Sequence, residues 1–103
     1  MNVDDIPVGE GRAFAVGNEQ VALFRLRDGT LRALDAVCPH RGGPLADGLI
    51  DGNVVVCPLH GYTYDLRTGA ELHNGGQSVC AYTVAVNGHQ QISVRPNQLA
   101  PAD

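Results

Sequence analysis

Two pairs of cysteine and histidine stand close together in the middle of the chain. Cys38 and His40 are separated by one proline, and Cys57 and His60 follow after sixteen further residues. Each pair brings one thiolate and one imidazole into a tight turn, and both groups are soft ligands that suit zinc and iron. The repeated order of the ligands predicts one metal site to which both pairs contribute.

A structural zinc site is one alternative, because two cysteines and two histidines are a common tetrahedral ligand set. The spacing of the first pair argues against zinc, because only one residue separates Cys38 from His40, whereas zinc fingers leave about two to four residues between paired ligands. Neither pair opens a segment with helical periodicity, as the second half of a zinc finger does. A purely structural role, with buried cysteines and surface histidines, would leave the repeated pairing unexplained.

The segment CPHRGGPLADGLIDGNVVVCPLHGYTYD resembles the Rieske family motif, in which Cys-x-His is followed by Cys-x-x-His after roughly fifteen to seventeen residues. The resemblance implies that Cys38 and Cys57 bind one iron of a 2Fe-2S cluster, and that His40 and His60 bind the other. Two neutral imidazoles in place of thiolates remove negative charge around the cluster, which raises its reduction potential. The chain is therefore expected to carry one electron at a time.

Over nearly its whole length the chain resembles the small subunit of assimilatory NAD(P)H nitrite reductase, in the segments DIPVGEG, VALFRLRDGTLRALDAVCPHRGGPLADGLI and VVCPLHGYTYDLRTG. The residues around GGPLADG carry most of this resemblance. The alternative is the Rieske ferredoxin component of ring-hydroxylating dioxygenase systems, which shares the ligand motif. Such ferredoxins usually have a proline-bearing loop where this chain has residues 73–78, which favours the first resemblance. Either implies redox protein partners, a reductase donor and an acceptor or large catalytic subunit, and no catalysis by the chain alone.

The loops also indicate where the reduction potential lies. High-potential Rieske proteins carry a disulfide between two extra loop cysteines, and Gly43 and Leu59 stand at those positions here. Tyr62 replaces a serine that donates a hydrogen bond to a cluster sulfide, so we expect a potential in the lower part of the family range. Tyr64 matches a tyrosine near a ligand sulfur, or is a packed strand residue. Arg41 either assists docking or is a solvated loop residue.

Short alternating or β-branched stretches between Gly, Asn and Asp predict an all-β fold, and no stretch has sustained helical periodicity. The expected strands cover residues 13–16, 21–26, 30–36, 54–56, 62–66, 80–86 and 91–94. Tight turns are expected at Gly17–Asn18, Asp28–Gly29 and Asn87–Gly88. We expect one Rieske-like antiparallel β sandwich or barrel over residues 1–103, with a small, loop-rich cluster-binding subdomain at about 37–76.

The composition narrows the classes of partner. Seven Arg, no Lys and eleven acidic residues give a formal charge of -4, which argues against nucleic acid or an anionic membrane. The apolar runs are too short to span a membrane, and no basic segment leads into an apolar one at the N-terminus. Three cysteines cannot all pair, which favours a reducing compartment. We expect a cytoplasmic protein.

Three further residues of ligand type lie outside the paired motif. Cys80 falls on the same predicted strand face as Tyr82 and Val84, so we expect it to be a small core residue. His73 and His89 lie in turn regions without a paired partner nearby in the sequence, so we expect them on the surface.

Overall fold

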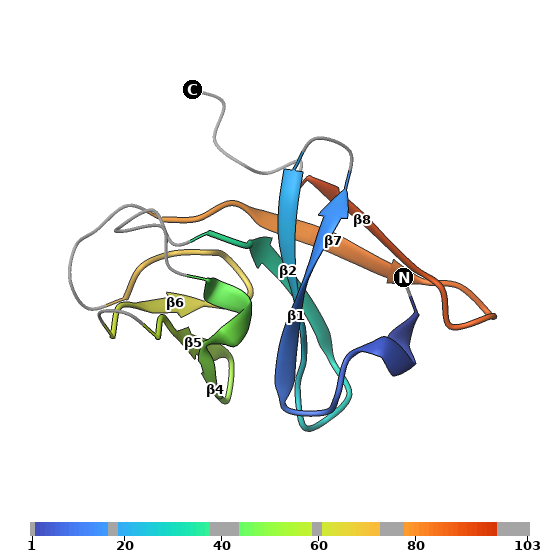
Figure 1. The fold of residues 1–103 in the computed structure, drawn as a ribbon, viewed down its shortest axis with the longest axis horizontal. Helices are drawn as coiled ribbons and strands as arrows, with labels where there is room; N and C mark the ends of the chain where they lie inside the picture. Colours follow the sequence, from blue (N-terminus) through green and yellow to red (C-terminus); the bar gives the residue numbers. More distant parts are fainter. Residues whose placement is uncertain (1, 17–18, 38–43, 59–60, 73–77, 97–103) are drawn as a thin grey trace.

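The computed structural model describes residues 2–16, 19–37, 44–58, 61–72 and 78–96, and these residues form two antiparallel sheets (Figure 1). The elements in chain order are η1 (Val3–Asp5), β1 (Glu10–Val16), β2 (Glu19–Arg25), β3 (Leu31–Asp35), η2 (Leu45–Asp47), β4 (Leu49–Asp51), β5 (Val54–Val56), β6 (Thr63–Asp65), β7 (Ala81–Val86) and β8 (Ile92–Pro96). The all-β prediction is confirmed. No helix in the described part of the chain is long and apolar enough to cross a membrane.

The larger sheet has the strand order β1-β2-β3-β7-β8. β1 and β2 pair from Glu10 opposite Arg25 to Val16 opposite Glu19, which agrees with a hairpin at residues 17–18, themselves outside the described residues. β3 joins β7 over a short ladder in which Ala33 lies opposite Tyr82. Strands from both halves of the sequence therefore meet in this sheet.

The turn between β2 and β3 lies at the predicted place, but it includes Arg27 as well as Asp28 and Gly29. Gly29, with a φ of 91°, donates its N–H to the carbonyl of Leu26 at 2.9 Å, and the Leu26 N–H donates to the carbonyl of Thr30 at 2.8 Å. The carboxylate of Asp28 accepts the backbone N–H of Thr30 at 2.9 Å. This hydrogen bond favours the charged form and lowers the pKa of Asp28.

The smaller sheet has the order β4-β5-β6, and β5 has the bounds that the sequence predicted. β4 was not predicted, although Gly52 and Asn53, which follow Asp51, have the composition of a two-residue hairpin turn. Gly52 has a φ of 61°, as the first position of such a turn requires. The three consecutive valines of β5 indicate a strand, whereas β4 has only one β-branched residue, Ile50, and so gives a weaker signal.

Two buried clusters share the strand β2, whose side chains alternate between them. Ala22 and Phe24 point into the cluster that lies between the two sheets, whereas Val21 and Leu23 point into a second cluster, formed by the larger sheet and the N-terminal residue Ile6. The cluster between the sheets consists of Ala22, Phe24, Leu26, Leu34, Ala36, Leu45, Ala46, Val55, Cys57, Tyr64, Leu66, Val79 and Ala81. Because both faces of β2 are covered, its sequence reads as a continuous apolar run.

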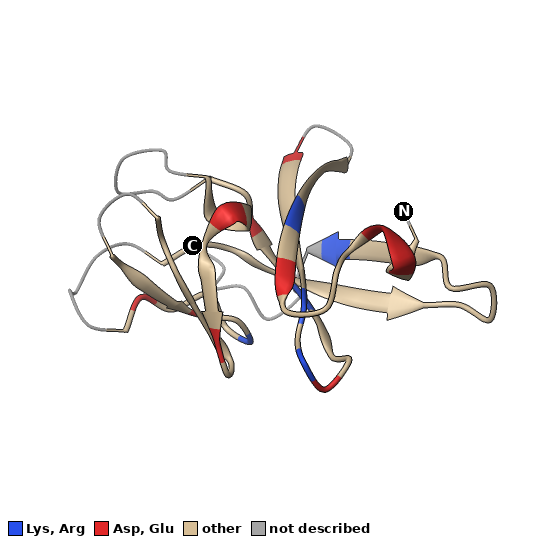
Figure 2. Ribbon diagram, turned by 60° about the horizontal axis from the view of Figure 1, so that its bottom comes forward, with Lys and Arg blue, Asp and Glu red and all other residues tan. Residues whose placement is uncertain are grey.

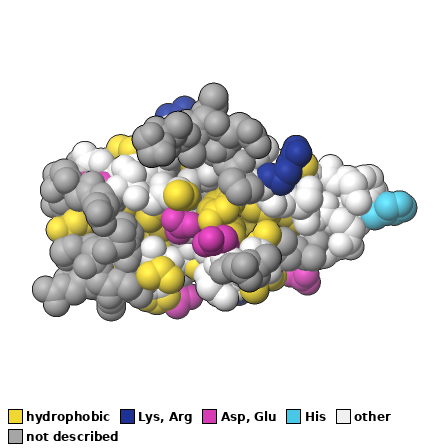
Figure 3. All heavy atoms as spheres, turned by 90° about the horizontal axis from the view of Figure 1, so that it is seen from above, with side chains coloured by type: hydrophobic (Ala, Val, Ile, Leu, Met, Phe, Trp, Pro, Cys, Tyr) yellow, Lys and Arg dark blue, Asp and Glu magenta, His cyan; other side chains and the backbone are white. Residues whose placement is uncertain are grey.

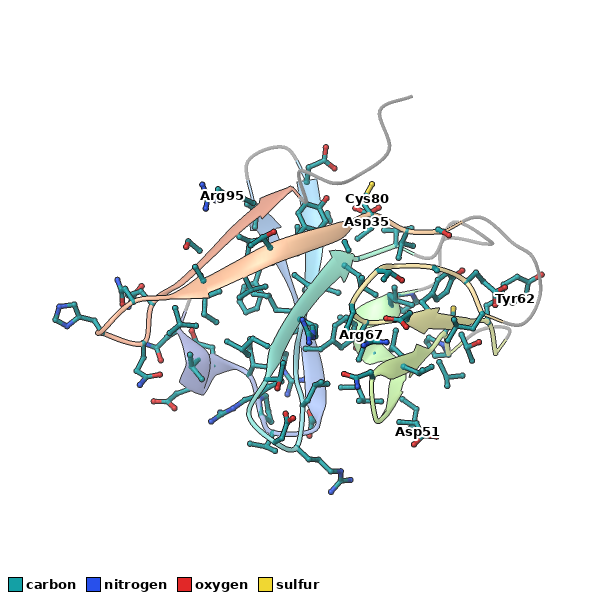
Figure 4. The ribbon with its side chains drawn as sticks, turned by 180° about the vertical axis from the view of Figure 1, so that it is seen from behind. Asp35, Asp51, Tyr62, Arg67, Cys80 and Arg95 are labelled. Carbon is teal, nitrogen blue, oxygen red and sulfur yellow. The ribbon has the colours of Figure 1, made fainter. Side chains whose placement is uncertain are left out.

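The prediction that Cys80 is a core residue is wrong, because its side chain is exposed (Figure 4). Successive side chains of an extended chain point to opposite sides, and Val79 and Ala81 both point into the cluster between the sheets. Cys80, between them, therefore faces solvent. Its backbone N–H donates to Asp35 at 2.9 Å, and the hydroxyl of Tyr82 donates to the same carboxylate at 2.8 Å.

The carboxylate of Asp35 controls the acidity of its two neighbours. Its negative charge raises the pKa of the Cys80 thiol, and partial desolvation acts in the same direction. Burial raises the pKa of Tyr82, and the hydrogen bond to Asp35 raises it further. The Cys80 thiol is thus held in its neutral form, which is the less reactive one.

The hairpin between β7 and β8 is present, but its turn is longer than the two residues Asn87–Gly88. The N–H of Gln90 donates to the carbonyl of Asn87 at 3.1 Å, and the Asn87 N–H donates to the carbonyl of Gln91 at 3.0 Å. The positive φ lies at Gln90 (63°) and not at Gly88. His89 is exposed at this tip, as predicted (Figure 3), and His73 lies outside the described residues.

Replacing Gln90 with glycine is expected to stabilise the fold. A left-handed backbone costs a residue with a side chain about 1–2 kcal/mol, and the greater freedom of glycine in the unfolded chain offsets part of the gain. The free energy of unfolding, measured by urea denaturation, should rise by about 0.5–1 kcal/mol in Gln90→Gly. Gln90→Val should lower it, since a β-branched side chain fits this conformation poorly. A Gln90→Gly protein less stable than the wild type would show that the backbone at Gln90 is not strained.

Candidate metal centre

The first Cys/His pair follows a fixed piece of backbone at the end of β3. The N–H of Leu45 donates to the carbonyl of Ala36 at 2.8 Å, and Val37 forms an antiparallel bridge with Pro44. The chain therefore enters and leaves residues 38–43 at two neighbouring positions. Cys38 directly follows Val37, so the sheet determines where this loop begins.

The return from the first loop packs against β5, which leads to the second pair. Leu45 and Ala46 of η2 are buried in the cluster between the sheets. Gly48 follows, and a Cβ there would collide with the carbonyl oxygen of Val56 and lie 2.8 Å from a methyl group of Val55. Only glycine allows this close approach, which ties the end of the first loop to the strand before Cys57.

The second Cys/His pair begins in a hydrogen-bonded turn. The N–H of Cys57 donates to the carbonyl of Tyr62 at 2.7 Å, and the Gly61 N–H donates to the carbonyl of Cys57 at 3.1 Å. Gly61 has a φ of 73°, which reverses the chain into β6. The side chain of Cys57 is 2% exposed, and Cys57 is not part of a disulfide. The backbone around this predicted ligand is therefore held on both sides.

The described residues at the start and end of each Cys/His loop, here called the loop bases, pack in one apolar cluster. Ala36 and Leu45 from the first base and Cys57 and Tyr64 from the second belong to the same buried cluster. Packing therefore holds the described residues that flank the two loops together, beside the small sheet (Figure 1). Of the predicted site residues, Cys57, Tyr62 and Tyr64 are described, whereas Cys38, His40, Arg41, Gly43, Leu59 and His60 lie outside the described residues.

A further extended segment beside β6 was not predicted from the sequence. The N–H of Leu72 donates to the carbonyl of Thr63 at 2.9 Å, and Glu71 forms an antiparallel bridge with Tyr64. The turn before it is closed by Asp65, whose carboxylate accepts the N–H groups of Arg67 at 2.7 Å and Thr68 at 3.3 Å. The ladder and the turn fix the place of Glu71 next to the second loop.

The pKa of Asp65 reflects this turn. Partial burial acts to raise the pKa, but the hydrogen bonds from Arg67 and Thr68, together with the positive charge of Arg67, outweigh it. The pKa of Asp65 is therefore lower than usual. The carboxylate stays ionised at neutral pH, where it accepts both hydrogen bonds.

Comparison with known families decides between the metals. A Rieske [2Fe-2S] domain model matches residues 1–86, which include both Cys/His pairs. The chain belongs to the Rieske family. A Rieske-type 2Fe-2S cluster is accordingly its cofactor, and the zinc alternative is not favoured.

Individual Rieske proteins resemble the chain over most of its length. The ferredoxin component of naphthalene 1,2-dioxygenase/salicylate 5-hydroxylase systems from a Ralstonia species is 34% identical over 70 residues, 68% of this chain and 66% of that protein. The chain thus spans just under two thirds of that curated relative. The solved ferredoxin of carbazole 1,9a-dioxygenase from Nocardioides aromaticivorans IC177 gives a TM-score of 0.84 with 31% identity and 94% coverage of both chains.

A third similar protein belongs to another system. The structure assigned as an NADH-dependent nitrite reductase small subunit from Mycobacterium tuberculosis gives a TM-score of 0.83 with 28% identity. The superposition covers 90% of this chain and 88% of that one. The predicted Rieske-like fold is thus confirmed, and both systems anticipated from the sequence occur among the solved Rieske proteins that resemble this chain.

The described part of the site fits a Rieske cluster. The buried thiol of Cys57, at the start of a hydrogen-bonded turn, is a suitable sulfur ligand. The residues that flank the first Cys/His loop, Ala36 and Leu45, pack in the same apolar cluster as this thiol. The apolar wall formed by Tyr64, Val55 and Leu45 keeps water away from this side of Cys57. Burial of that kind is one of the means by which a protein sets the potential of a cluster.

Gly61→Ala is expected to weaken the second loop. A left-handed φ costs alanine about 1–2 kcal/mol, so both the stability of the fold and the amount of cluster retained should fall. Gly61→Asn should lose less, because asparagine tolerates this conformation better. Urea unfolding and the visible absorbance of purified protein measure the two effects. Gly88→Ala is the matched control, since Gly88 has no positive φ and no crowded neighbour; an equal loss there would contradict the argument.

Proposed function

We propose that this Rieske protein carries one electron at a time on a cluster held by Cys38, His40, Cys57 and His60. The observation that supports this assignment most is that both Cys/His pairs follow hydrogen-bonded backbone that packs in one buried apolar cluster. Cys38 and Cys57 would bind one iron through sulfur, and His40 and His60 the other through ring nitrogen. When bound, the cluster supplies a one-electron redox couple.

The four ligands would leave no open position on either iron, so the chain would transfer electrons and not transform a substrate by itself. We take residues 1–103 as one domain, in which about 37–76 form the cluster-binding part. The cytoplasm is the compartment that we assign to it, since the predicted ligand cysteines need to remain reduced. The fold then serves to hold the two loops and to present them to another protein.

Two of the exposed apolar side chains of the described residues lie next to the Cys/His loops, where we expect a redox partner to dock. Val37, directly before Cys38, is 52% exposed, and Leu72, beside β6, is 41% exposed. Exposed apolar groups of this kind are common where proteins meet. Electron transfer needs a short distance between cofactors, so a contact beside the cluster loops suits this function.

The partner that we assign first is the large catalytic subunit of an assimilatory nitrite reductase, on the basis of the sequence phrases shared with its small subunit. The oxygenase of a ring-hydroxylating dioxygenase system is the second candidate, because the dioxygenase ferredoxin superposes over 94% of both chains with 31% identity. Stopped-flow mixing of the reduced chain with each partner separates the two. Fast reoxidation by the nitrite reductase subunit supports the first, and fast reoxidation by the oxygenase alone supports the second.

Replacing any one of the four proposed ligands, for example Cys57→Ser or His60→Ala, is expected to abolish the cluster. Iron and sulfide should fall close to zero, and the electron paramagnetic resonance signal of the dithionite-reduced protein should disappear, because one iron would lose one of its two protein ligands. The wild-type signal should have the low average g-value of a centre ligated by histidine. Protein prepared without oxygen is needed for both measurements.

Cys80→Ser and His89→Ala are the matched controls for the ligand variants. Both replace exposed residues of the same types outside the motif, so cluster content and spectrum should stay at the wild-type level. A colourless wild-type protein that contains one zinc per chain would overturn the electron-carrier function and leave a structural module.

Tyr64→Phe is expected to lower the reduction potential of the cluster. Tyr64 is fully buried in the same apolar cluster as Cys57. If it has the role of the matching tyrosine of high-potential Rieske proteins, its hydroxyl would lie near a ligand sulfur. A hydrogen bond contributes about 0.5–1.5 kcal/mol, which corresponds to roughly 20–65 mV for a one-electron couple. Redox titration followed by visible absorbance measures the shift. An unchanged potential would assign Tyr64 to packing alone.

A further inference from the structure

One peptide group connects Cys57 to a carboxylate. The carbonyl oxygen of Tyr62 accepts the N–H of Cys57 at 2.7 Å. The N–H of the same peptide group, which belongs to Thr63, donates to Oε2 of Glu71 at 3.3 Å. The two hydrogen bonds therefore lie at opposite ends of a single peptide dipole, with Glu71 at its positive end and Cys57 at its negative end.

The position of Glu71 is determined by the sheet. Glu71 forms a bridge with Tyr64, and the next residue, Leu72, donates its N–H to the carbonyl of Thr63 at 2.9 Å. Given the C–N and C=O bond lengths of a peptide, the carboxylate oxygen and the Cys57 nitrogen are no more than about 9 Å apart. This separation is shorter than the Debye length of about 10 Å at 0.1 M salt, so solvent ions screen the charge only in part.

We propose that Glu71 lowers the reduction potential of the cluster through the Tyr62–Thr63 peptide, an inference that rests on the proposed role of Cys57 as a ligand. Hydrogen bonds in a chain polarise one another, so a carboxylate on the N–H increases the negative charge on the Tyr62 oxygen. Negative potential around Cys57 opposes the arrival of an electron on the iron that it binds. Glu71 is thus a tuning residue that acts through the backbone.

Glu71→Gln tests this role, because glutamine keeps an oxygen acceptor for the Thr63 N–H and removes the charge. The midpoint potential, measured by redox titration of the cluster-loaded protein, should shift upward. Glu71→Asp keeps the charge, so its potential should remain closer to the wild type. Asp51→Asn is the matched control, since it removes one negative charge from the exposed tip of the β4–β5 hairpin, at a different end of the small sheet from Tyr62 (Figure 4).

The outcomes separate this inference from the proposed function. An unchanged potential in a fully loaded Glu71→Gln protein would overturn the tuning role while the carrier function stands. Equal upward shifts in Glu71→Gln and Asp51→Asn would also overturn it, because net charge alone would then explain both. Wild-type protein without iron and sulfide would overturn the carrier function and this inference together.

A loading defect in the variant is also informative. If Glu71→Gln binds no cluster, Glu71→Ala is titrated in the same way, and an upward shift supports the inference. Loss of the cluster from both neutral variants, with Glu71→Asp fully loaded, would assign Glu71 to cluster assembly and overturn the tuning role.

Discussion

The apolar contact between the two sheets is the interaction on which the site depends. Phe24 from β2 and Leu45 from η2 pack in one cluster with Val55, Cys57 and Tyr64 of the small sheet and its second loop. At about 25 cal/mol for each square ångström buried, contacts of this kind supply most of the energy that holds such elements together. Both loop bases are anchored in this cluster, so the packing that stabilises the fold also sets the distance between them.

Acidic and basic side chains lie outside this apolar cluster. Acidic and basic residues lie on strands, on the short 3-10 helices and in turns (Figure 2), and Arg12 and Glu10 of β1 pair at 3.0 Å. The carboxylate of Asp35 joins β3 to the start of β7, because it accepts hydrogen bonds from Cys80 and Tyr82. Asp35 therefore connects two strands, whereas the apolar contacts hold the loop bases together.

Much of the fold and the ligand motif could be predicted from the sequence, because both depend on local patterns. The alternation of β7 and the turn at Asp28–Gly29 need only neighbouring residues, and the Cys/His pairs are recognisable by their spacing. The exposure of Cys80 could not be predicted from the sequence, because it depends on how much of each strand face is covered. Two separate apolar clusters cover opposite faces of the larger sheet. Glu71 also escaped prediction, because its place comes from pairing with β6 and not from any motif.

The order of the strands has a consequence for how the chain folds. β3 and β7 are neighbours in the larger sheet, yet the whole small sheet lies between them in the sequence. The β1–β2–β3 meander closes only short loops, whereas the contact of Ala33 with Tyr82 has to close a long one, at a greater cost in chain entropy. The meander is therefore expected to form first, and the long closure to be the slow step. Iron can then be captured late, by a chain whose framework is already folded.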